Sequence, residues 1–135
     1  MNILVIDGQG GGVGKQLVAA IKSSMPHAVI TAIGTSSSAT TTMLKAGADY
    51  AATGENAIIV GCRNADVIVG PVGIVIADSL MGEITPAMAV AIGQSSAKRV
   101  LIPVNQCNNI IVGVPDLSLT KLLQGTTEKI QSFAD

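Results

Sequence analysis

The chain has 135 residues, a formal net charge of −1, 13% charged residues and 48% hydrophobic ones. This length predicts a single domain over residues 1–135. A near-neutral chain with one Phe, one Tyr and no Trp lacks the basic patch and the aromatic platform of a nucleic-acid-binding protein. Soluble domains typically carry about 25% charged residues. The shortage here indicates either a surface rich in Gly, Ser and Thr or apolar surface buried against another subunit, and a homo-oligomer is favoured.

A membrane protein is not expected. The longest apolar stretch, residues 67–77, has only 11 residues and contains Pro71, whereas a bilayer span needs about 20. No basic leader precedes the first apolar run. Cys62 and Cys107 fit neither a zinc site nor a dense disulfide framework, and no metal site is expected. These features favour a cytoplasmic protein.

Apolar, β-rich runs alternate with helix-like segments along the chain. Strands are predicted where the runs are continuous, at residues 2–6, 28–33, 66–70 and 99–104, with 109–114 as a fifth. Helices are predicted at residues 13–25, 37–48, 54–65 and 84–97, and at 117–133 with an interruption or kink near Gly125. The clearest helix start is Thr85 as N-cap with Pro86 at the first helical position. Residues 72–82 fit a helix or a strand, and a helix is favoured.

This alternation predicts an α/β fold. With right-handed crossovers it gives a single Rossmann-like three-layer sandwich around a mostly parallel sheet of four or five strands.

A glycine-rich loop follows the first predicted strand, in the segment "IDGQGGGVGKQLVAAI" at residues 6–21. In such a fold this loop lies at the carboxyl edge of the sheet, where ligands bind, and the following helix N-terminus attracts anions. Lys15 lies in the first helical turn, where its positive charge interacts unfavourably with the helix dipole at a cost of about 0.3–1 kcal/mol. A bound anion would offset this cost. We therefore expect a phosphate site formed by Gly8, Gly10, Gly11, Gly12, Val13, Gly14 and Lys15. The alternative is a tight structural turn with Lys15 in solvent.

The spacing of these glycines disfavours ATP hydrolysis. A P-loop needs G-x-x-x-x-G-K-[ST], but Gln9 stands at the first glycine and Gln16 at the magnesium-binding hydroxyl. The stretch "GGGVGKQ" is similar to the "KGGVGKT" loop of partition-type ATPases, without its first lysine and its hydroxyl.

Gly8, Gly12 and Gly14 instead satisfy G-x-x-x-G-x-G, so the loop resembles the cofactor loop of short-chain dehydrogenases. Asp7 stands where that family usually has Thr. The resemblance implies NAD(P) or another nucleotide as the cofactor. The family's Tyr-x-x-x-Lys catalytic pair is missing, because Tyr50 is followed four places later by Gly54. A reductase of that family is therefore excluded.

Polar residues follow two other predicted strands. NAD-binding proteins place Asp or Glu after the second strand, but "GTSSSATTT" has no acid there. The hydroxyls of Thr35, Ser36 and Ser37 would hydrogen-bond a ribose or a second phosphate, or Ser37 or Ser38 would only cap the next helix. After the fourth strand, "PVNQCNN" supplies the amides of Asn105 and Asn108, expected on the same edge as the glycine loop.

Candidates for chemistry are few. Cys107 would need a neighbouring base, and the single histidine, His27, is expected at the opposite edge of the sheet. Asp78 is expected in a surface loop or subunit contact rather than at a ligand. Asp7 is placed either to approach the metal of a bound phosphate or to stabilise the loop through the glycine N–H groups.

From "MNILVIDGQGGGVGK" through "GADYAATGENA" to "VLIPVNQCNN", the chain resembles a small uncharacterised bacterial family of about this length, labelled a domain of unknown function. The resemblance implies no activity and no site residues. Three hypotheses remain: a protein that binds a nucleotide, dinucleotide or other phosphorylated small molecule, a small-metabolite enzyme that uses Asp7, Asp78 or Cys107, and an oligomeric structural or regulatory subunit without a small ligand.

Overall fold

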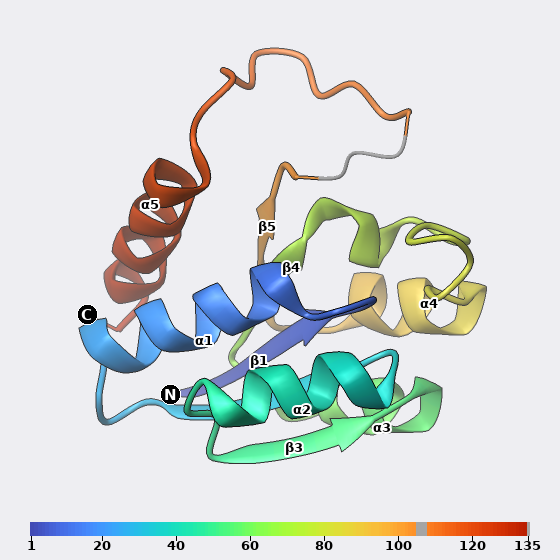
Figure 1. The fold of residues 1–135 in the computed structure, drawn as a ribbon, viewed down its shortest axis with the longest axis horizontal. Coiled ribbons are helices and arrows are strands. Elements are labelled where there is room, and N and C mark those ends of the chain that lie inside the picture. The colour runs from blue at the N-terminus through green and yellow to red at the C-terminus, as the bar shows by residue number, and fades with distance from the viewer. Residues whose placement is uncertain (105–107, 135) are drawn as a thin grey trace.

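The structure, a computed structural model, describes residues 1–104 and 108–134. The strands found there are β1 (Asn2–Asp7), β2 (Val29–Gly34), β3 (Tyr50–Thr53), β4 (Val67–Pro71) and β5 (Lys98–Ile102). The helices are α1 (Gly12–Ser24), α2 (Ser37–Lys45), α3 (Glu55–Gly61), α4 (Pro86–Gln94) and α5 (Leu119–Ser132), with a short 3-10 helix, η1, at Val72–Val75. The five strands are parallel and lie in the order β3-β2-β1-β4-β5 (Figure 1).

Helices cover both faces of this sheet. Alternate residues of β1 point to opposite sides, so Ile3 and Val5 pack with α1, α2 and α5, while Leu4 and Ile6 pack with α3, η1 and α4. Each face therefore has its own buried apolar cluster, which is why the strands are apolar at consecutive positions. This confirms the predicted α/β three-layer sandwich.

The strand order fixes where a ligand would bind. The chain runs outward from β1 through β2 to β3 and then returns to β4 on the other side of β1. In open parallel sheets, ligands bind at the carboxyl ends of the strands beside this reversal. The loop that leaves β1 lies there.

The sequence prediction misplaced the fifth strand. Residues 109–114 form no strand, and the fifth strand is β3 at the sheet edge. An apolar run becomes a strand only when a neighbouring strand pairs with it, and 109–114 has none. β3 pairs with β2 through Thr31↔Tyr50 and the three following pairs.

Two further predictions needed correction. Of residues 72–82, only Val72–Val75 is helical, as η1, and turns follow. The expected break at Gly125 is absent, because α5 continues from Leu119 to Ser132. A single exposed glycine weakens a helix without ending it. Over the described ranges, none of the helices has both the length and the apolar character needed to cross a membrane.

Candidate functional site

The glycine loop joins the end of β1 to the start of α1. Its turn is closed by the Gly11 N–H, which donates to the Gly8 carbonyl oxygen at 2.9 Å. Gly11 is the N-cap of α1 and has a φ of 73°. A Cβ on this residue would also lie 2.9 Å from the Ala39 Cα. Only glycine suits this position, where α1 and α2 approach closely.

Asp7 occupies the interior of the loop. Its Oδ1 accepts the Gly8 N–H at 2.8 Å and its Oδ2 accepts the Gly14 N–H at 2.7 Å, and the side chain is buried. Burial raises the pKa of Asp7 above 3.8, the hydrogen bonds from Gly14 and Gly8 lower it, and the negative charge of Glu83 raises it further. Of the two roles considered for Asp7, the geometry matches the one that stabilises the loop.

The remaining loop amides differ in availability. The Gln9 N–H donates to Glu83 Oε1 at 2.8 Å. The N–H groups of Gly10 and Gly12 donate to no backbone acceptor in the described part of the chain. A Cβ built on either would meet no atom within 4 Å, so both face open space. Gly10 and Gly12 therefore present the accessible donors, and Val13 is half-buried beside them.

Lys15 is exposed on the first turn of α1. It lines a hollow of about 430 Å³ between α1 and α2, together with Thr42 and Lys45. Sequence analysis did not identify Lys45, because it lies at the far end of the next helix. The hollow is therefore lined by one lysine from each helix, Lys15 from the first turn of α1 and Lys45 from the last turn of α2.

The hydroxyl cluster after β2 divides into three roles. Thr35 Oγ1 donates to Glu83 Oε1 at 2.6 Å. Ser36 is the N-cap of α2, since its Oγ accepts the Ala39 N–H at 3.2 Å and donates to the Gln9 carbonyl at 2.9 Å. The cap was expected at Ser37 or Ser38. Ser37 is exposed as the first residue of α2.

Glu83 is not among the site residues predicted from the sequence, where it stands only as an isolated acid near Asp78 that needs a partner or solvent. It follows a turn in which Asp78, Leu80, Met81 and Gly82 have φ angles of 68°, 54°, 56° and 86°. That turn carries the Glu83 carboxylate over the ends of β1 and β2, where Oε1 accepts from Gln9 and Thr35. A carboxylate from the segment before α4 therefore lies beside Thr35, the residue that follows β2.

The remaining sequence candidates come from other segments of the chain. Asn105 and Cys107 lie outside the described residues. Asn108 is exposed with a φ of 64°. Asp78 is exposed. Within residues 1–104 and 108–134, no cluster of three or more His, Cys, Asp or Glu side chains could hold a metal ion.

The fold and this edge define an α/β protein of Rossmann type with a glycine loop beside the point where the strand order reverses. The chain belongs to the family described as "Domain of unknown function (DUF3842)", which it matches over residues 2–135. This confirms the family expected from the sequence.

A search of curated proteins finds no match. Among solved structures, the chain is similar to a dodecameric FMN-dependent UbiX-like decarboxylase from Escherichia coli O157:H7. The identity is 15%, the TM-score is 0.48, and the alignment covers 97% of this chain and 94% of that one.

Proposed function

We propose that this protein binds a phosphorylated small molecule at the carboxyl edge of its sheet, with a phosphate group against the N–H groups of Gly10 and Gly12. The observation that carries the proposal is that these two donors are open while the neighbouring Gly8, Gln9, Gly11 and Gly14 amides are paired within the chain. They belong to the N-terminal end of a 13-residue helix. Such an end favours an anion through its free N–H groups and its dipole.

Charge limits where the phosphate lies. The carboxylates of Asp7 and Glu83 flank Gly8 and would repel an anion placed over that residue. The Gly10 and Gly12 side of the loop has no acid in the first turn of α1. Lys15 lies in that turn and would neutralise the phosphate, with Lys45 adding positive charge across the hollow.

The ligand class follows from Glu83. A carboxylate at the end of β2 accepts hydrogen bonds from ribose hydroxyls in dinucleotide-binding proteins. Glu83 Oε1 is held by Gln9 and Thr35, and Oε2 makes no hydrogen bond among the described residues. This supports a nucleotide or dinucleotide, with Oε2 facing an unphosphorylated ribose, and disfavours NADP. The Ser37 hydroxyl, exposed beside this edge, and Asn105 and Asn108 remain proposed ligand contacts.

The test is thermal melting of the wild type and Lys15→Ala with AMP, ADP, NAD, NADP, FMN and sugar phosphates. A ligand at about 100 times its Kd adds about 2.7 kcal/mol of stability, which raises Tm by several degrees for a chain of this size. We expect a nucleotide to raise Tm and Lys15→Ala to reduce that shift. Lys129→Ala, on the exposed side of α5, is the matched control and should leave it unchanged. No shift with any of these compounds would refute the proposal.

We also propose that the protein is a homo-oligomer. The charged fraction of 13% is low, and several large apolar side chains are exposed, with Met81, Ile110 and Val112 exposed by 94%, 90% and 94%. Surface of this kind marks a site of association.

A further inference from the structure

Residues 110–117, here called the arm, expose apolar side chains in succession. Ile110 is 90% exposed and Val112 is 94% exposed, and Ile111, Val114 and Leu117 are also exposed. Figure 1 shows this segment, in orange, running clear of the sheet and helices before it enters α5. Isolated apolar residues are ordinary on a protein surface, but a continuous group marks an interaction site.

The arm has a defined backbone shape at its tip. The Val114 N–H donates to the Ile111 carbonyl oxygen at 3.4 Å, which closes a turn. Gly113 in this turn has a φ of 83°, a conformation that glycine adopts without strain. Pro115 then restricts the backbone that leads to α5. The turn therefore presents Val112 outward.

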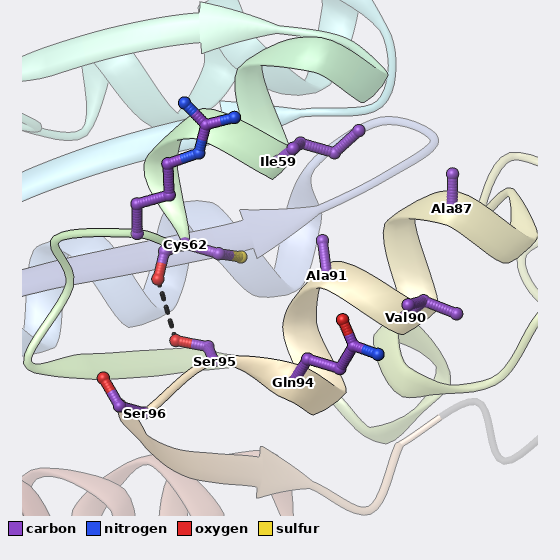
Figure 2. Close-up of a pocket in the computed structure, with 9 residues that line it drawn as sticks. Ile59, Cys62, Ala87, Val90, Ala91, Gln94, Ser95 and Ser96 are labelled. Carbon is purple, nitrogen blue, oxygen red and sulfur yellow. Dashed lines mark hydrogen bonds between the residues drawn. The ribbon is translucent and has the colours of Figure 1, made fainter.

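A groove of about 590 Å³ between α3 and α4 offers a complementary surface. Figure 2 shows Ile59 of α3 and Ala87, Val90 and Ala91 of α4 around it. Helix α4, "PAMAVAIGQ", buries Met88 and Ile92 against the sheet while its outer residue Val90 is 53% exposed. A helix that is apolar on all sides is normally covered on all sides.

The arm and the groove carry opposite charges. Asp116 is the single charged residue of the arm, and Arg63 is the single charged residue that lines the groove. Neither is in an ion pair within the described chain, where the pair found is Lys22–Asp49. An acidic residue on one surface and a basic residue on the other would pair across an interface.

We infer that the arm of one copy docks in the α3–α4 groove of a second copy, with Ile110 and Val112 against Ile59 and Val90 and with Asp116 paired to Arg63. The inference rests on the homo-oligomer proposed above. Because the arm and the groove are different surfaces, two copies exchange arms reciprocally or several copies close a ring.

Sedimentation equilibrium of the full chain tests the interface. Val112→Asp and Val90→Asp should each weaken association by roughly 100-fold, as for central interface residues. Leu44→Asp, on the exposed side of α2, should leave it unchanged. Circular dichroism and melting of each variant verify that it is folded. Arg63→Asp and Asp116→Arg should each weaken association, and the double variant should recover at least about tenfold of the loss.

Each other outcome contradicts the inference in a distinct way. A wild type that stays monomeric at high concentration overturns both the oligomer and the interface. An oligomer that persists in Val112→Asp and Val90→Asp overturns the interface alone. Loss of association in Val90→Asp, but not in Val112→Asp, means that the groove receives another segment. If the double variant recovers none of the lost association, Asp116 and Arg63 do not pair across the interface.

Discussion

The Asp7 carboxylate accepts the Gly14 N–H at 2.7 Å, so the end of β1 holds the first turn of α1 through one buried side chain. The same carboxylate accepts the Gly8 N–H at 2.8 Å. The glycine loop therefore has a buried carboxyl group beneath it. This explains why part of the loop is closed to a ligand while Gly10 and Gly12 remain open.

Replacing Asp7 by Ala should destabilise the protein. The change leaves two buried N–H groups without an acceptor, and each such group costs about 1–3 kcal/mol. We expect the free energy of unfolding, measured by urea denaturation, to fall by about 2–6 kcal/mol. Lys129→Ala, a surface substitution on α5, should change it by less than about 0.5 kcal/mol. An equally small change for Asp7→Ala would mean that water satisfies both amides.

Asp7 also makes stability depend on pH. Burial is the largest cause of the raised pKa of Asp7. The folded protein therefore holds the carboxyl proton of Asp7 more tightly than the unfolded chain, in which the pKa has its ordinary value of 3.8. The stability that this proton adds to the folded protein is fully present below the unfolded pKa, and it is lost as pH rises through the folded pKa. Asp7→Asn cannot titrate. The difference in unfolding free energy, wild type minus Asp7→Asn, should therefore decrease between about pH 3 and pH 7. A difference that increases over this range contradicts the raised pKa.

Asp49 should show the opposite dependence. Its pKa is lowered, first by the hydrogen bond from the Ile30 N–H and then by Lys22, whose Nζ lies 2.8 Å from Oδ2. Its stabilisation is therefore present above 3.8 and is lost as pH falls through the lowered folded pKa. In Asp49→Asn, the free energy of unfolding measured at decreasing pH should not show the part of the decrease that comes from protonation of Asp49. Lys22→Met should keep part of this pH dependence, because the hydrogen bond from the Ile30 N–H, the largest single cause of the lowered pKa, remains. A profile for Asp49→Asn identical to that of the wild type would show that the contact has no effect on stability.

The glycine loop and the outline of the sheet could be predicted because their signals are local. Consecutive apolar residues mark buried strands, and a glycine run before a helical pattern marks the loop. β3 had no such signal, since Tyr50 is 65% exposed and the strand has four residues at the edge. Residues 109–114 carry the β-branched composition of a strand but have no partner strand. Local composition cannot distinguish these two situations.

Glu83 could not be predicted from the sequence for a different reason. It is 48 residues from Thr35 along the chain. The two meet because the strand order returns the chain from β3 to β4, after which the turn before α4 extends over β1. That contact depends on the turn geometry at Leu80 and Met81, where non-glycine residues have left-handed backbones. Sequence patterns do not indicate such conformations for these residue types.

Two glycines of the loop should respond differently to alanine. A Cβ on Gly14 would lie 2.8 Å from the Asp7 Cβ and 2.5 Å from the Met43 Sδ, whereas a Cβ on Gly10 meets nothing within 4 Å. Gly14→Ala should reduce the free energy of unfolding by about 1–3 kcal/mol, as overpacked core substitutions do. Gly10→Ala should change it by less than about 0.5 kcal/mol. Urea denaturation of both variants measures the contrast, and equal values would contradict the close packing of α1 on β1.

Glu83 should set the preference between nucleotides with and without a 2′-phosphate. Its carboxylate, held by Gln9 and Thr35, would accept a ribose hydroxyl and repel a phosphate in the same place. We expect the wild type to bind NAD at least about tenfold more tightly than NADP, since a repulsion of about 1.4 kcal/mol is enough. Glu83→Gln removes the charge and should narrow that ratio, whereas a purely structural role would weaken both ligands equally. Calorimetric Kd values for the two nucleotides on both proteins measure it, with Lys129→Ala as the control. If the Kd ratio is the same in wild type and Glu83→Gln, the ribose is not bound at Glu83, even when the phosphate is held at Gly10 and Gly12.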